Sequence, residues 1–171
     1  NSMNKTDTVA ESEQNAQRLL SMLINAIPNP AFFRNKDGLF IDCNSAFVEM
    51  VLGTPCENLV GRSVFDLLEI IPKALKDICL ENDNKLLNQP GIQTHETAIA
   101  CGDGVQREFL LSRSTFAGKN GEVEGIVSVL LDQTDKNRAE KLLQDRTAEL
   151  DKSNLELERQ IKKRKKAKRT V

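Results

Sequence analysis

The four cysteines carry the most reactive side chains of the chain, and their spacing limits the chemistry they can do. Cys43, Cys56, Cys79 and Cys101 are 13, 23 and 22 residues apart, so no Cys-x-x-Cys pair exists for a zinc ribbon or a thioredoxin-type site. Each lies among apolar residues, where a free cysteine behaves as a small buried hydrophobe. We therefore expect buried thiols in a reducing compartment and no metal site.

His95 is the only histidine, so a Ser/His/Asp triad or a two-histidine metal site would depend on it alone. Its neighbours Thr94 and Glu96 favour a strand position with a solvent-facing or salt-bridging side chain. The chain has no Trp and no Tyr, which argues against an aromatic cage or a tryptophan-stacked flavin pocket. We expect no catalytic residues, and a binding or regulatory module rather than an enzyme.

Charge is distributed unevenly along the 171 residues. Residues 132–171 hold 13 Lys/Arg and 8 Asp/Glu, whereas residues 1–131 hold 11 and 17. The basic run 162–169 could contact nucleic acid or anionic lipid, but it lacks interleaved aromatics and a base-reading fold. We interpret it as a solvated block and expect no nucleic-acid partner. No apolar run approaches the about 20 residues of a membrane span, and a cytoplasmic location is expected, although the parent protein could be membrane-anchored.

The elements that position these residues begin with a predicted helix at 11–27, after a flexible N-terminus or cloning remnant at 1–10. Apolar residues recur at the spacing of one helical stripe, namely at Ala16, Leu19, Leu20, Leu23 and Ile27. Pro28 and Pro30 end this helix. We expect the stripe to pack on the outer face of a sheet, or on its copy in a second subunit.

Residues 28–134 predict a small α+β domain. Two short strands flank the turn at Asp37-Gly38, a helix follows Asn44 or Ser45 and ends at Gly53, and a loop spans 54–62. Further helices are expected at 63–71 and 73–88, and three strands at 92–101, 105–116 and 122–131. This order predicts a five-stranded antiparallel sheet with short helices on one face.

The segment 135–171 contains no Gly or Pro and predicts one long helix. Leu143, Leu150 and Leu157 recur every seven residues, which assigns them to heptad position d and places Asn154 at position a. Leu at d with a single Asn at a is typical of a parallel two-stranded coiled coil in fixed register. We expect a homodimer through these four residues; the alternative is a lone amphipathic helix folded on its own domain.

These motifs, in this order, resemble the PAS family of sensor domains over residues 19–135. The hairpin from Pro30 to Phe47 is similar to the PAS opening, and residues 59–67 are similar to its "-IG-S-FDL-" segment. Gly121 to Val127, followed by Asp132-Gln133-Thr134, resembles the last strand and the "D-I-T" ending, with Gln in place of Ile. The tail resembles the linker helix of bacterial sensor histidine kinases.

The resemblance implies a ligand pocket between the sheet and the short helices. Strand alternation and the family pattern make the pocket-facing candidates Ile41, Cys43, Phe47, Phe65, Ile99, Leu110 and Val127; the alternative is that these are plain core. Heme is not expected, because residues 73–88 hold no histidine, and flavin is not expected, because Cys79 lacks the Asn-Cys-Arg context. An uncharged or weakly polar metabolite, or no ligand, remains. Arg34 and Arg113 could meet a carboxylate, but surface positions are favoured.

The resemblance also implies a signalling role. Asp132 and Thr134 lie where the last strand becomes the output helix, and they are the expected signal-coupling residues; Thr134 or Asp135 can cap that helix. We expect a regulatory fragment of a two-component histidine kinase, with the output domain in the same polypeptide. The alternatives are a diguanylate cyclase or other signalling parent, or a stand-alone small-molecule-binding module.

Overall fold

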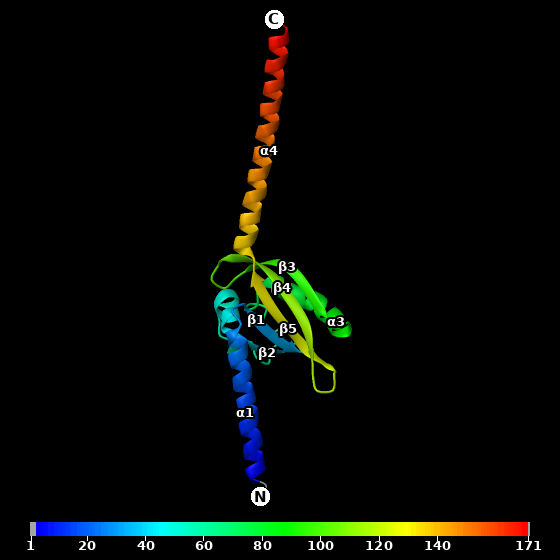
Figure 1. Cartoon of the computed structure of the whole chain (residues 1–171). Coiled ribbons are helices and arrows are strands. Elements are labelled where there is room, and N and C mark those ends of the chain that lie inside the picture. The colour runs from blue at the N-terminus through cyan, green and yellow to red at the C-terminus, as the bar shows by residue number, and fades with distance from the viewer. Residues whose placement is uncertain (1–2, 171) are drawn as a thin grey trace. The chain divides into compact units, whose positions relative to one another are not determined.

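The computed structural model describes residues 3–170, and it divides at residue 134 into two units, 1–133 and 134–171. The first unit holds all strands and the second is a single helix (Figure 1). In chain order the elements are α1 (Met3–Ala26), β1 (Ala31–Asn35), β2 (Phe40–Cys43), α2 (Ser45–Phe47), the π-helical turn Val48–Leu52, the 3₁₀ turn Cys56–Asn58, α3 (Lys73–Asn88), β3 (Ile92–Ala100), β4 (Gln106–Ala117), β5 (Val123–Asp132) and α4 (Thr134–Arg169).

The five strands form one antiparallel sheet in the order β2-β1-β5-β4-β3 (Figure 1). This confirms the predicted α+β fold class. Side chains alternate between the two faces of each strand. The inner face, which α3 contacts at β3, β4 and β5, carries Phe32, Phe109, Leu111 and Leu130, all at most 1% exposed. The outer face carries partly exposed residues such as Phe33, Leu110 and Val129.

The core lies between this inner face and the helical segments that follow β2. Phe32 packs against Phe40 and Phe47, with ring centroids 5.4 and 4.8 Å apart. From α3, the buried side chains are Leu75, Cys79 and Leu86, which are four and seven residues apart along one face of the helix. Burial of each large apolar side chain stabilises the domain by about 1.5–3 kcal/mol.

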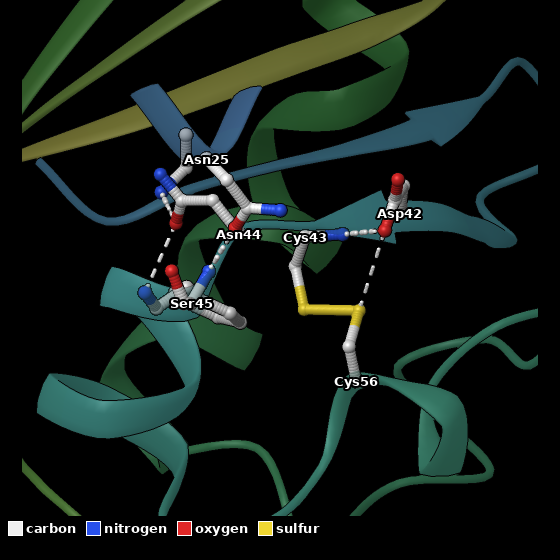
Figure 2. Close-up of a disulfide and its surroundings, with 8 residues drawn as sticks. Asn25, Asp42, Cys43, Asn44, Ser45 and Cys56 are labelled. Carbon is white, nitrogen blue, oxygen red and sulfur yellow. Dashed lines mark hydrogen bonds between the residues drawn. A yellow bond between two sulfur atoms is a disulfide. The ribbon is translucent and has the colours of Figure 1, made fainter. Parts of the chain in front are cut away.

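Asn44 joins the end of α1 to the sheet and to α2, which explains the predicted helix start here. Its side-chain oxygen accepts hydrogen bonds from the backbone N–H groups of Ala31 (2.9 Å) and Phe47 (3.0 Å), the second being an N-cap. Its amide lies within bonding distance of the carbonyls of Ile24, Ile27 and Asn29. Figure 2 shows Asn44 beside Asn25 and Ser45, where Asn25 accepts a hydrogen bond from the Ser45 N–H.

The predicted packing of the N-terminal stripe is not seen within the chain. Leu19, Leu20 and Leu23 are 57%, 46% and 59% exposed, and Ile24 is the buried residue of this part of α1. The end of α1 is held to Asn44 and Ser45 through Ile24 and Asn25, which are not part of the stripe, and the stripe itself faces solvent. Packing of the stripe on a second subunit stays a prediction. The helix itself begins at Met3 rather than at residue 11.

Two other elements differ from the sequence prediction. Residues 63–71 form successive turns rather than a helix, with three-residue hydrogen bonds such as Asp66 N–H to Ser63 O and Ile70 N–H to Leu67 O. The helix after Asn44 widens into a π-helical turn at Val48–Leu52 and ends at Gly53. Gly53 has φ +71°, a left-handed conformation that glycine adopts without steric cost.

The expectation of four unbonded thiols is wrong for two of them. Cys43, at the end of β2, forms a disulfide with Cys56 in the following 3₁₀ turn (Figure 2). The spacing of 13 residues does not reveal this pairing, because the pairing depends on how the chain turns back after β2. Those turns bring the Cα atoms of Cys43 and Cys56 to 6.0 Å, which is within the range for a disulfide. Cys79 and Cys101 are free and buried, as predicted.

Candidate functional site

Two arginines lie inside the inner face of the sheet, where one carboxylate bridges them. Arg34 on β1 is 2% exposed and Arg113 on β4 is 0% exposed. Asp83 of α3 binds both nitrogens at the end of the Arg34 guanidinium, at 2.8 and 2.9 Å, and also accepts a hydrogen bond from Arg113 Nη2. Surface positions were expected for both arginines, and this expectation is wrong.

The reason lies in the strand pattern. Arg34 pairs with Ile126 of β5, and Arg113 pairs with Ser128, so both fall on inner-face positions of the sheet register. A sequence pattern of apolar-inside and polar-outside residues assigns arginine to the solvent face. The Asp83 carboxylate of α3 offsets the free-energy cost of burying the two guanidinium charges. It is 49 residues from Arg34 and 30 residues from Arg113 in the sequence.

Hydrogen-bonding capacity around the cluster is incompletely used. In the part of the chain that the structure describes, six buried side-chain atoms have no hydrogen-bond partner: Arg34 Nε, Gln93 Oε1, His95 Nε2, Arg113 Nε, Arg113 Nη1 and Ser128 Oγ. The register places Gln93, Arg113 and Ser128 in one row across β3, β4 and β5. Buried polar atoms are nearly always paired, so a group of unpartnered atoms is unusual inside a protein.

The electrostatics leave the cluster with excess positive charge. Burial, the largest effect, lowers the pKa of Arg34, but the Cys79 and Asp83 interactions outweigh it and raise that pKa overall. Burial raises the pKa of the Cys79 thiol and, together with Arg113, lowers the pKa of His95. At neutral pH the thiol and imidazole are therefore uncharged, and two arginines face one carboxylate.

A cavity of about 220 Å³ opens beside this cluster. Arg34, Cys79, Asp83 and Ile126 line it from the sheet and α3, and Phe65 lines it from the turns after β2. This is smaller than the about 300–1,000 Å³ of sites for drug-sized ligands. The cavity therefore suits a compact molecule.

The predicted pocket residues lie in four different places. Cys43, Phe47 and Ile99 are buried in the core cluster, and Phe65 is 67% exposed at the wall of the cavity. Leu110 pairs with Leu131 and Val127 with Phe33 on the outer face, so neither can face the inner side; that part of the prediction is wrong. Ile41 is 39% exposed, because the register shifts between Phe33 and Arg34 and leaves Ile41 unpaired.

Four residues in or beside the arginine cluster were not predicted as site residues, namely Asp83, Gln93, His95 and Ser128. For His95, a strand position was predicted correctly, but its Nε2 is buried rather than facing solvent or a salt bridge. Side chains two residues apart on a strand lie on the same face, so Arg113 lies on the face of Leu111, and Ser128 on the face of Leu130. This alternation in the sequence could have indicated that Arg113 and Ser128 face the core.

The predicted signal-coupling residues flank a very short junction. Asp132 is the last residue of β5 and Thr134 the first of α4, with only Gln133 between them. The Gln133 N–H donates to the Glu108 carbonyl at 2.7 Å, which continues the sheet pairing into the junction. Asp132 and Thr134 are both engaged in interactions of their own.

The predicted dimer residues lie on α4, whose 36 residues include no buried side chain. Leu143, Leu150 and Leu157 are 70%, 63% and 52% exposed, and Asn154 is exposed as well. In the part of the chain that the structure describes, the leucine repeat is therefore exposed along α4. Among the described residues, no helix is both long and apolar enough to cross a bilayer.

Comparison with solved structures finds similar folds. The PAS domain of BvgS from Bordetella pertussis is 17% identical, covers 78% of this chain and 98% of that chain, and gives a TM-score of 0.50. The phage VqmA–DPO complex is 20% identical over 80% of this chain and 62% of that chain, with a TM-score of 0.61. The PAS domain of an HTR-like protein from Haloarcula marismortui is 18% identical over 74% and 98%, with a TM-score of 0.51.

Comparison with curated protein sequences finds no match. A family model described as PAS domain matches residues 28–135, which include every strand of the sheet and the arginine cluster. That match covers more than half of the chain, and the fold agrees with it. The chain therefore belongs to the PAS domain family.

Proposed function

We propose that this PAS domain is the sensory part of a signalling protein and that it passes its state through α4 to an output domain. The observation that carries the proposal is the junction at Gln133. One residue separates the central strand β5 from a 36-residue helix. A connection this short cannot absorb movement by loop flexing, so a shift in β5 reaches α4 as a rotation or a change of register.

The exposed leucine repeat supports dimerisation through α4. Leu150 and Leu157 are spaced as consecutive d positions, with Asn154 at the a position between them, the arrangement of parallel two-stranded coiled coils. Packing of this repeat against a second copy would remove from solvent leucine side chains that are more than half exposed in the single chain. Homodimerisation through α4 would also bring two output domains together.

A histidine kinase is the output domain that the linker-helix resemblance supports; a diguanylate cyclase is the second candidate, because it can follow the same kind of linker. The chain itself is proposed to be non-catalytic, because its one histidine, His95, has a buried Nε2 atom without a hydrogen-bond partner. Small-molecule sensing is supported by the cavity beside Asp83 and by the phage VqmA structure, which holds DPO. No nucleic-acid partner is proposed.

Sedimentation of the chain tests the dimer. Replacing Leu150 and Leu157 with Ala should weaken self-association, because each large-to-small change at a packed position costs about 2–5 kcal/mol. Leu155→Ala is the matched control, since Leu155 is 51% exposed but lies off the predicted seam. A wild-type chain that stays monomeric at all concentrations, or a control as disruptive as the double variant, would contradict the proposal.

A further inference from the structure

We propose that the cluster around Arg34, Asp83 and Arg113 binds a compact organic anion with a single carboxylate and a neighbouring hydrogen-bond donor. This inference rests on the proposed sensory function and names the class of ligand for that site. It departs from the uncharged or weakly polar metabolite that the sequence favoured.

The charge of the cluster calls for one more negative group. The two guanidiniums carry two positive charges and Asp83 carries one negative charge, while Cys79 and His95 are neutral at pH 7. Both arginines are at least 98% buried, so water cannot screen the remaining charge. A monoanion brings the net charge of the cluster to zero, whereas a phosphate, with about −1.5 to −2 charges at pH 7, makes the net charge negative.

The unpartnered atoms define what the ligand must offer. Arg34 Nε, Arg113 Nε and Arg113 Nη1 are donors without acceptors. They need an acceptor group, and a carboxylate forms short, charge-assisted hydrogen bonds with guanidinium nitrogens. Gln93 Oε1 is an acceptor without a donor in the same row of the sheet, and a hydroxyl or amino group next to the carboxylate would satisfy it.

Access is provided by the cavity that ends at Arg34 and Asp83. Both residues line it, whereas Arg113 does not line the cavity and is joined to it through its hydrogen bond to Asp83. Asp83 comes from α3, whereas the arginines come from the sheet. A ligand carboxylate that takes up the free guanidinium nitrogens therefore acts where α3 is attached to the sheet.

The experiment is a titration of the full chain followed at the arginine Nε–H signals by NMR. The probes are lactate, which is a carboxylate with an adjacent hydroxyl, its neutral amide lactamide, and inorganic phosphate. Lactate should shift the Nε–H signals of Arg34 and Arg113 in a saturable manner. Lactamide and phosphate should shift them at least tenfold less at equal concentration and ionic strength.

Arg113→Met is the diagnostic variant, because it removes the excess charge and keeps the Arg34–Asp83 pair intact. It should weaken lactate binding at least tenfold at the remaining Arg34 Nε–H signal. Lys119→Met, which removes an exposed charge in the turn before β5, is the control and should leave lactate binding unchanged. Circular dichroism establishes that each variant is folded.

Three results would overturn the inference: no shift with lactate, equal shifts with lactamide or phosphate, or unchanged lactate affinity in folded Arg113→Met. If Arg113→Met does not fold, the comparison of lactate with lactamide and phosphate on the wild-type chain still decides the ligand class. None of these results bears on signalling through α4, which the sedimentation of the Leu150 and Leu157 variant tests separately.

Discussion

Replacing Asp83 with Asn tests whether this carboxylate holds the buried arginines in place. The change keeps the shape of the side chain but removes the one negative charge that Arg34 and Arg113 share. Removing one partner of a buried ion pair costs about 3–5 kcal/mol, because the remaining charge stays buried without compensation. Asp83 keeps 20% exposure of its side chain, which places the expected loss near the lower end, about 3 kcal/mol.

The assay is urea unfolding followed by circular dichroism, since the chain has no Trp or Tyr for fluorescence. With a slope of about 1–3 kcal/mol per molar urea, a loss of this size lowers the midpoint by about 1–3 M. Asp77→Asn is the matched control on the same helix, because Asp77 pairs with Lys73 at 2.6 Å at the surface. Its midpoint should not change. Equal midpoints for Asp83→Asn and wild type would refute the cluster as a tightly coupled buried unit.

Three further predictions concern the disulfide, His95 and the helix junction. Under oxidising conditions, Cys56→Ser should lower the free energy of unfolding by about 3 kcal/mol, the value for a disulfide that closes a loop of this length. In reductant the variant and the wild type should be equally stable. If the two proteins are equally stable under oxidising conditions as well, the Cys43–Cys56 bond does not form in solution. Burial and Arg113 lower the pKa of His95 in the folded state, so below about pH 6.5 the unfolded chain binds a proton that the folded chain does not, and stability should fall as the pH drops. His95→Gln should abolish that part of the pH dependence of stability. An unchanged pH profile in the variant would place His95 in solvent. Thr134→Val and Asp132→Ala should alter the basal output of the full-length parent while the domain stays folded; unchanged output, ligand response and melting temperature in both would make the junction a passive linker.

The fold was predictable because its signals are local. The turn at Asp37-Gly38, the prolines before Ala31 and the glycines between the later strands separate the elements in sequence. The helix at Lys73–Asn88 has exactly the predicted bounds, and the strands differ by a residue or two. The turns at 63–71 were predicted as a helix, since three-residue hydrogen bonds and a helical turn share the same sequence pattern over short stretches.

The site was less predictable because it depends on long-range contacts. Ile41 was placed inside by strict alternation, but the irregularity opposite Phe33 and Arg34 interrupts that alternation. Arg113 was placed outside by its charge, because its partner Asp83 comes from a different element. The Cys43–Cys56 bond likewise requires knowledge of how the chain folds back after β2.

Native mass spectrometry of the purified chain tests the central claim most directly, because one spectrum reports both the oligomeric state and a bound small molecule. For a dimeric sensor module we expect a species of twice the 19.1 kDa chain mass, carrying a small molecule that is lost in Arg113→Met. A monomer of 19.1 kDa at every concentration, with no ligand bound in wild type, would contradict the account.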